Sequence, residues 1–129
     1  MSDWTELVAA AEQAMASAYA PYSGFRVGAA LECEDGTVFV GANVENSSFG
    51  LTICAERSAV VTAVTHGKQR FSRIAIRTEA EEPVAPCGAC RQFLSEFAPN
   101  LQVLSVYSGG QTEWTLRALL PVPFHLGGE

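Results

Sequence analysis

Apolar residues at the start of the chain recur at steps of three and four, which is the spacing of one helical face. They are Trp4, Leu7, Val8, Ala11, Ala14, Met15 and Ala18. Asp3 and Glu6 form a candidate capping pair for this helix, and Pro21 is expected to close it because proline cannot continue a helix. The chain is therefore predicted to begin with an amphipathic helix.

Between residues 26 and 45 the apolar positions follow a period of two, and Asp35-Gly36 interrupts the alternation. That combination is typical of a β-hairpin, so strands are predicted over residues 26–33 and 37–45. Cys33 falls on the same face as Ala29 and Leu31, which makes it a candidate for a small buried core residue.

After the hairpin, helical and strand patterns alternate. Residues 54–65 predict a helix ending near Gly67, and Ile74 and Ile76 mark one face of a strand over residues 72–78. The remaining predicted elements are a short amphipathic helix at 89–97, a strand at 101–107, a turn at 108–110 and a short helix at 115–120. Strands joined by helices imply right-handed crossovers, so we predict a three-layer α/β/α domain. Its sheet should be mostly parallel, apart from the opening hairpin.

Composition narrows the possible partners. The chain has 129 residues, of which 48% are apolar, and this size indicates one domain over residues 1–129. A net charge of -6 disfavours nucleic acid and anionic membranes as partners. There is no run of ~18 apolar residues, and the acidic start is unlike a signal peptide. We expect a cytoplasmic protein, whose four cysteines are core, catalytic or metal-bound residues rather than disulfides.

Three of these cysteines fall in two short motifs, Cys54-Ala55-Glu56-Arg57 and Pro86-Cys87-Gly88-Ala89-Cys90-Arg91, each at an expected helix start. Free N–H groups and the positive dipole end at a helix start stabilise thiolates, and thus favour metal ligation. Three protein ligands would leave one position of a tetrahedral Zn²⁺ for water, as in catalytic zinc sites.

The other candidates for a fourth ligand are less suitable. Cys33 is expected in the core, His66 beside a helix end and His125 in an exposed proline-rich tail. None of the three has the spacing of a metal ligand.

Glu56 could move protons for a zinc-bound water, although a glutamate in a first helical turn is often only favoured by the helix dipole. In a regular helix the side chains of residues 54 and 56 point about 200° apart around the helix axis. Both can therefore serve one site only if the side chain of Cys54 projects from the cap position, outside the regular helix. Arg57 and Arg91 are candidates to offset the charge of the thiolates, with surface salt bridges as the alternative.

Cys-Ala-Glu, followed about thirty residues later by Pro-Cys-x-x-Cys, resembles the zinc-dependent nucleoside deaminases. Further segments resemble the short-chain cytidine deaminases: Pro21-Tyr22-Ser23-Gly24-Phe25, Val27-Gly28-Ala29-Ala30, Asn43-Val44-Glu45-Asn46, and the tail from Leu119 to Phe124. This resemblance implies a mixed, mostly parallel five-stranded sheet and one Zn²⁺ per chain, held by Cys54, Cys87 and Cys90.

The resemblance also implies the reaction. Zinc-activated water would attack C4 of cytidine or 2′-deoxycytidine, and ammonia would leave to give uridine or 2′-deoxyuridine in pyrimidine salvage. Glu56 would protonate N3 and later the departing amine.

The family assigns ribose binding to Asn43 and Glu45, which lie two apart near a strand end and therefore share one face. On their own these two residues are a turn Asn and a solvated Glu. Phe25 resembles the ring that stacks on the pyrimidine, and the Ala55 N–H is a candidate donor to the base carbonyl.

Short-chain cytidine deaminases are homotetramers, so the resemblance implies that Phe124 reaches the pocket of a neighbouring subunit. Tyr22 and Phe49 would lie near the interface, with Phe49 where many relatives carry Tyr.

Four other interpretations remain open. A blasticidin-S-type deaminase shares the zinc core but differs around the segment assigned to ribose. A structural zinc or binding module would need a closed four-ligand site, and a dithiol redox protein using Cys87 and Cys90 would leave Cys54-Ala55-Glu56 without a role. A polynucleotide deaminase is disfavoured by the acidic charge.

Overall fold

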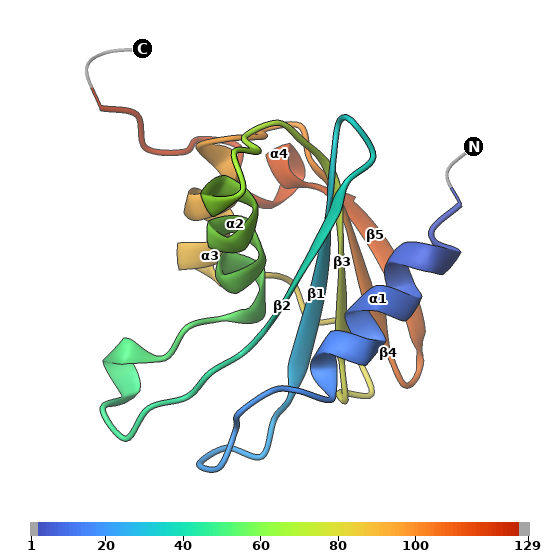
Figure 1. The fold of residues 1–129 in the computed structure, drawn as a ribbon, viewed down its shortest axis with the longest axis vertical. Helices are drawn as coiled ribbons and strands as arrows, with labels where there is room; N and C mark the ends of the chain where they lie inside the picture. The colour runs from blue at the N-terminus through green and yellow to red at the C-terminus, as the bar shows by residue number, and fades with distance from the viewer. Residues whose placement is uncertain (1–2, 127–129) are drawn as a thin grey trace.

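The computed structural model describes residues 3–126, so the first two and last three residues of the predicted 1–129 domain lie outside the described range. A five-stranded sheet lies between two helical layers, with α1 on one face and α2, α3 and α4 on the other (Figure 1). The elements are α1 Thr5–Met15, β1 Val27–Cys33, β2 Val38–Ala42, the 3₁₀ turn η1 Phe49–Leu51, α2 Ala55–Thr65, β3 Phe71–Thr78, α3 Gly88–Ser95, β4 Gln102–Tyr107, β5 Gly110–Thr115 and α4 Leu116–Leu119.

The strand order is β2-β1-β3-β4-β5. β1 pairs antiparallel with both β2 and β3, β3 pairs parallel with β4, and β4 pairs antiparallel with β5. The prediction of a mixed five-stranded sheet in three layers is confirmed, but the prediction that it is mostly parallel is wrong. β2, β3 and β4 do run in the same direction. However, β1 is inserted between β2 and β3, and β5 returns as a hairpin, so only the β3–β4 pairing is parallel.

The local pattern alone did not predict β5. The strand follows a two-residue turn at Ser108-Gly109 and pairs along β4 from Tyr107 opposite Gly110 to Gln102 opposite Thr115. It lies at the edge of the sheet with only Thr112 and Trp114 half-buried, so its apolar signal is weak. The glycine turn followed by Thr112 and Trp114 on one face was the signal that could have revealed it.

Three predicted helix boundaries can be compared with the structure. The first helix ends at Met15, earlier than predicted, and Asp3 Oδ1 accepts the N–H of Thr5 at its start at 3.0 Å. α2 ends as predicted, because Gly67 adopts a φ of 84° and the N–H of Lys68 bonds to Ala63. The last helix is shorter than predicted, and its cap is Thr115, whose Oγ1 accepts the N–H of Ala118 at 3.2 Å.

Apolar residues of the sheet are buried on both faces. On the α1 side, Ala30, Ala75 and Leu104 pack with residues of that helix. On the opposite side, Ala29, Leu31 and Cys33 join the α2 cluster. Cys33 is buried, which confirms its predicted place in the core. Within residues 3–126, no helix is long and apolar enough to cross a membrane.

Gly41 sets how closely α2 approaches the sheet. A Cβ at this position in β2 would lie 2.5 Å from both the carbonyl oxygen of Ala55 and the N–H nitrogen of Ala59. Those are backbone atoms of the first turns of α2, so they cannot give way as a flexible side chain would. The start of α2 is thus held directly against the strand.

We therefore predict that Gly41→Ala displaces α2 and lowers the free energy of unfolding by about 1–3 kcal/mol, the usual cost of overpacking. Urea denaturation followed by circular dichroism measures the change. Gly50→Ala is the matched control, because nothing lies within 4 Å of a Cβ there. Equal denaturation midpoints for the two variants would contradict the close-packing argument.

Candidate metal and catalytic site

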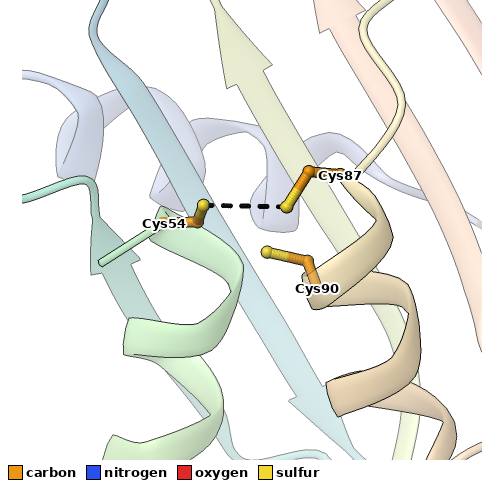
Figure 2. Close-up of side chains that lie close together, drawn as sticks. All are labelled: Cys54, Cys87 and Cys90. Carbon is orange, nitrogen blue, oxygen red and sulfur yellow. Dashed lines mark hydrogen bonds between the residues drawn. The ribbon is translucent and has the colours of Figure 1, made fainter. Parts of the chain in front are cut away.

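Three cysteine thiols from two helix starts point toward one another (Figure 2). Cys54 is the N-cap residue of α2, Cys87 is the N-cap residue of α3, and Cys90 lies in the first turn of α3. Their Sγ atoms all lie within 4.8 Å of one another, and those of Cys54 and Cys87 are 3.9 Å apart. The group is positioned to bind one metal ion, and three thiolate donors fit zinc with a fourth position left for water.

The backbone of the caps makes this convergence possible. Cys54 has φ -74° and ψ 155°, and Cys87 has φ -66° and ψ 169°, so both are extended rather than helical. Cys54 therefore leaves from the cap, as the predicted geometry requires if it and Glu56 are to serve one site. A helix start carries free N–H groups and the positive end of the helix dipole, which favour the thiolate form of cysteines at these positions.

Arg57 offsets part of the negative charge of the cysteine thiolates. Its Nη2 donates a hydrogen bond to Cys54 Sγ at 3.3 Å. Hydrogen bonds from the Cys90 thiol and then from Arg57 lower the pKa of Cys54 to about 5, against the opposing effect of burial. The same bond to the Cys54 thiolate, together with burial, raises the pKa of Cys90. The cluster thus already favours one thiolate at neutral pH.

Arg91, a candidate partner of the thiolates in the sequence analysis, instead binds backbone carbonyls. Its Nε donates to the carbonyl of Pro86 at 2.7 Å, and its Nη1 donates to the carbonyl of Leu119 at 2.9 Å. Arg91 therefore fixes the backbone just before Cys87 and the end of α4, and its hydrogen bonds go to carbonyls rather than to sulfur.

Glu56 is a buried carboxyl group in the first turn of α2, with only 6% of the residue exposed. Burial is the main cause that raises its pKa to about 7, and the charge of Cys54 adds to the rise. A carboxyl group poised near neutral pH can both accept and donate a proton.

Glu45 holds the loop that precedes β1. Its Oε1 accepts the backbone N–H groups of Tyr22 at 3.0 Å and Ser23 at 3.1 Å, and its Oε2 accepts the Ser23 hydroxyl hydrogen. Ser23 Oγ in turn accepts the N–H of Phe25 at 3.0 Å. The sequence did not single out Ser23, although a serine hydroxyl that bonds to the N–H two residues on is a familiar turn signal.

Asn43 braces the same loop from the other end. Its Nδ2 donates to the carbonyl of Phe25 at 2.8 Å, and its Oδ1 accepts the N–H of Val27 at 2.9 Å. Asn43 is buried, whereas Phe25 between these anchors remains partly exposed. The structure thus brings Asn43, Glu45 and Phe25 together as one braced segment.

Beside this segment lies a pocket of about 250 Å³ lined by Tyr22, Ser23, Glu45, Phe49 and Thr52. The rings of Tyr22 and Phe49 meet edge to face, with centroids 5.9 Å apart, and both residues are exposed. A carboxylate next to exposed aromatic rings suits a ligand that has both hydroxyl groups and an apolar face.

The remaining predicted residues lie as follows. Ala55 is buried at the first position of α2, and Phe124 is exposed on the C-terminal segment beside α3. His66 is exposed, with its Nδ1 2.9 Å from the carbonyl of Thr62, and His125 is also exposed. In the described part of the chain neither histidine joins the thiol group.

Sequence comparison identifies related proteins. The family described as cytidine and deoxycytidylate deaminase zinc-binding region matches residues 1–105. A cytidine deaminase from Sporosarcina psychrophila is 44% identical over 124 residues, which cover 95% of this chain and 91% of the relative. A cytidine deaminase from Halalkalibacterium halodurans is 46% identical over 120 residues, which cover 92% of this chain and 91% of the relative.

Solved structures show the same fold. Cytidine deaminase from Burkholderia pseudomallei matches with a TM-score of 0.89 and 44% identity, covering 95% of this chain and 100% of that chain. Cytidine deaminase from Mycobacterium tuberculosis matches with a TM-score of 0.83 and 41% identity, covering 98% of this chain and 100% of that chain. The similarity therefore extends over both helical layers and the sheet.

We predict that the purified protein contains one zinc ion per chain and that Cys90→Ser lowers the zinc content well below one. A serine hydroxyl is a much poorer zinc ligand than a thiolate. Plasma mass spectrometry of the purified chains measures the metal. Cys33→Ala is the matched control, because it removes a buried thiol outside the group and should keep its zinc. Equal zinc loss in both variants would contradict this assignment.

Proposed function

The chain belongs to the cytidine and deoxycytidylate deaminase family, and on this premise we propose that it hydrolyses cytidine and 2′-deoxycytidine to uridine and 2′-deoxyuridine. Ammonia is the second product, and the reaction serves pyrimidine salvage. The observation that carries the proposal is the group of three thiols at the starts of α2 and α3, with the buried Glu56 two residues after Cys54 in the first turn of α2. A structural zinc module needs neither an open ligand position nor a buried carboxyl group.

Zinc, when held by Cys54, Cys87 and Cys90, supplies a Lewis acid that acidifies water. Glu56 accepts one proton of the water that attacks C4 and delivers it to N3, where it stays in the product. Glu56 then accepts the second proton of the same oxygen and delivers it to the departing amine, so that ammonia leaves. Burial shields the carboxyl group from bulk water, so its proton passes to the substrate. Arg57 remains hydrogen-bonded to Cys54 and offsets the charge of the thiolates.

The braced loop binds the nucleoside. Phe25 offers a ring face to the pyrimidine, and the N–H of Ala55 donates to the base carbonyl. Glu45 and Asn43 have hydrogen-bonding capacity left after their contacts to the loop: a lone pair on Glu45 Oε2, and one N–H and one lone pair on Asn43. Ribose hydroxyls use this remaining capacity, so the loop and the sugar share the same two side chains.

We also propose that the protein is a homotetramer in the cytoplasm. The single domain of residues 1–129 forms a homotetramer in which Phe124 reaches a neighbouring copy and Tyr22 and Phe49 lie near the interface. Exposed rings support this, since Phe49 is 74% and Phe124 67% exposed. Four free cysteines suit the reducing cytoplasm.

The test of this proposal is an ultraviolet absorbance assay of the purified holoenzyme with cytidine, 2′-deoxycytidine, cytosine and blasticidin S side by side. Both nucleosides should be deaminated, and the free base should be a much poorer substrate because it lacks the sugar. Turnover of blasticidin S in place of the nucleosides would transfer the proposal to that class of deaminase. Absence of turnover on all four would favour a binding module and overturn the proposed activity.

We predict that Glu56→Gln keeps the zinc and the fold but lowers kcat by about 10²–10⁴-fold, because an amide cannot shuttle a proton. Steady-state kinetics with cytidine, together with zinc content, measures the effect. Glu6→Gln is the matched control, since Glu6 is also a first-turn glutamate, in α1, and it should leave turnover unchanged. A near-normal rate for Glu56→Gln would remove Glu56 from the proton transfer.

A further inference from the structure

Gln92, two residues after Cys90 in α3, binds the C-terminal segment at Phe124. Gln92 Nε2 donates to the carbonyl of Phe124 at 3.0 Å, and Gln92 Oε1 accepts the N–H of Phe124 at 2.9 Å. The side-chain amide thus pairs with the backbone of Phe124 in both directions, as two neighbouring β-strands would. This pair of hydrogen bonds fixes the orientation of the Phe124 backbone as well as its position.

The two hydrogen bonds to Gln92 are the main attachment of the C-terminal segment. Within the described residues 121–126, the hydrogen bonds to the rest of the chain are the two to Gln92. The apolar side chains provide little packing, since Val122 and Leu126 are each 85% exposed. In Figure 1 the segment leaves α4, passes the helical layer and projects away from the body of the molecule.

The same turn of α3 also fixes the beginning of the segment. Arg91 donates hydrogen bonds to the carbonyl of Leu119, two residues before Pro121, and to the carbonyl of Pro86, just before Cys87. Residues 90 to 92 therefore provide, in succession, a thiol of the metal group, an anchor for the end of α4 and the grip on Phe124. The backbone of Phe124 is thus anchored at both polar atoms, whereas the residue itself remains exposed.

We propose that Gln92 is a positioning residue for the deaminase reaction: it orients Phe124 so that the ring enters the nucleoside site of a neighbouring copy. This rests on the proposed function, in which Phe124 acts across the subunit boundary. An exposed aromatic ring on a braced backbone loses little conformational freedom when it stacks on a pyrimidine, so it stabilises the bound nucleoside more than the same ring on a mobile tail.

The first experiment compares steady-state kinetics for cytidine in Gln92→Ala, Phe124→Ala and the double variant. Each single change should raise KM about threefold to tenfold, the range set by one aromatic contact, with kcat within about twofold and zinc content unchanged. The double variant should raise KM no further than Phe124→Ala. Gln92→Glu keeps the acceptor for the Phe124 N–H but turns a carboxylate oxygen toward the Phe124 carbonyl, so it should raise KM at least as much as Gln92→Ala.

Glu96→Ala is the matched control, because Glu96 is the exposed C-cap residue of α3, one turn after Gln92, and its loss should leave KM unchanged. An unchanged KM in Gln92→Ala would overturn the proposal. A parallel fall of kcat, zinc content and thermal stability in that variant would also overturn it, since this would show a merely structural role.

A mixed assembly tests whether the ring acts across the boundary. Chains carrying Glu56→Gln have an intact tail but very low turnover, whereas chains carrying Gln92→Ala have a working site and a loose tail. When the two are co-expressed with different tags and purified together, the measured KM should return toward that of the parent. A KM that stays at the Gln92→Ala value would overturn the proposal. Failure of the proposed function is distinguishable, because the parent chain itself would then not deaminate cytidine.

Discussion

The meeting of two helix starts at one point is the constraint on which the site depends. β2 and β3 run in the same direction, and each is followed by a helix on the same face of the sheet. Helices that return from like-directed strands begin at the same edge, so α2 and α3 present their first turns side by side. Extended caps at Cys54 and Cys87 then direct two thiols inward, and Gly41 lets α2 lie close enough to β2.

The charged groups around the three thiols suit this site to catalysis. Three thiolates around one divalent cation leave excess negative charge, and the bond from Arg57 to Cys54 reduces it. The neighbouring Glu56 carboxyl group is buried, so it is not held as a permanently ionised surface group. Helix N-termini, a guanidinium group and a buried acid therefore act on one small volume, each supplied by the first turns of α2 and α3.

Local sequence features predicted the site better than the sheet. The cysteine motifs, the cap position of Cys54 and the buried Cys33 depend on residues within one or two turns, and these predictions agree with the structure. The mostly parallel sheet was wrong because strand order is not a local property: nothing near β1 indicates that it lies between β2 and β3. The braces by Ser23 and Gln92 were missed for the same reason, since their partners Glu45 and Phe124 lie 22 and 32 residues away.

X-ray absorption spectroscopy at the zinc edge of the purified protein is the most direct test of the central claim that Cys54, Cys87 and Cys90 hold one catalytic ion. The account predicts three sulfur neighbours at about 2.3 Å and one lighter oxygen or nitrogen neighbour. Four sulfur neighbours, or a shell dominated by histidine nitrogen, would contradict it.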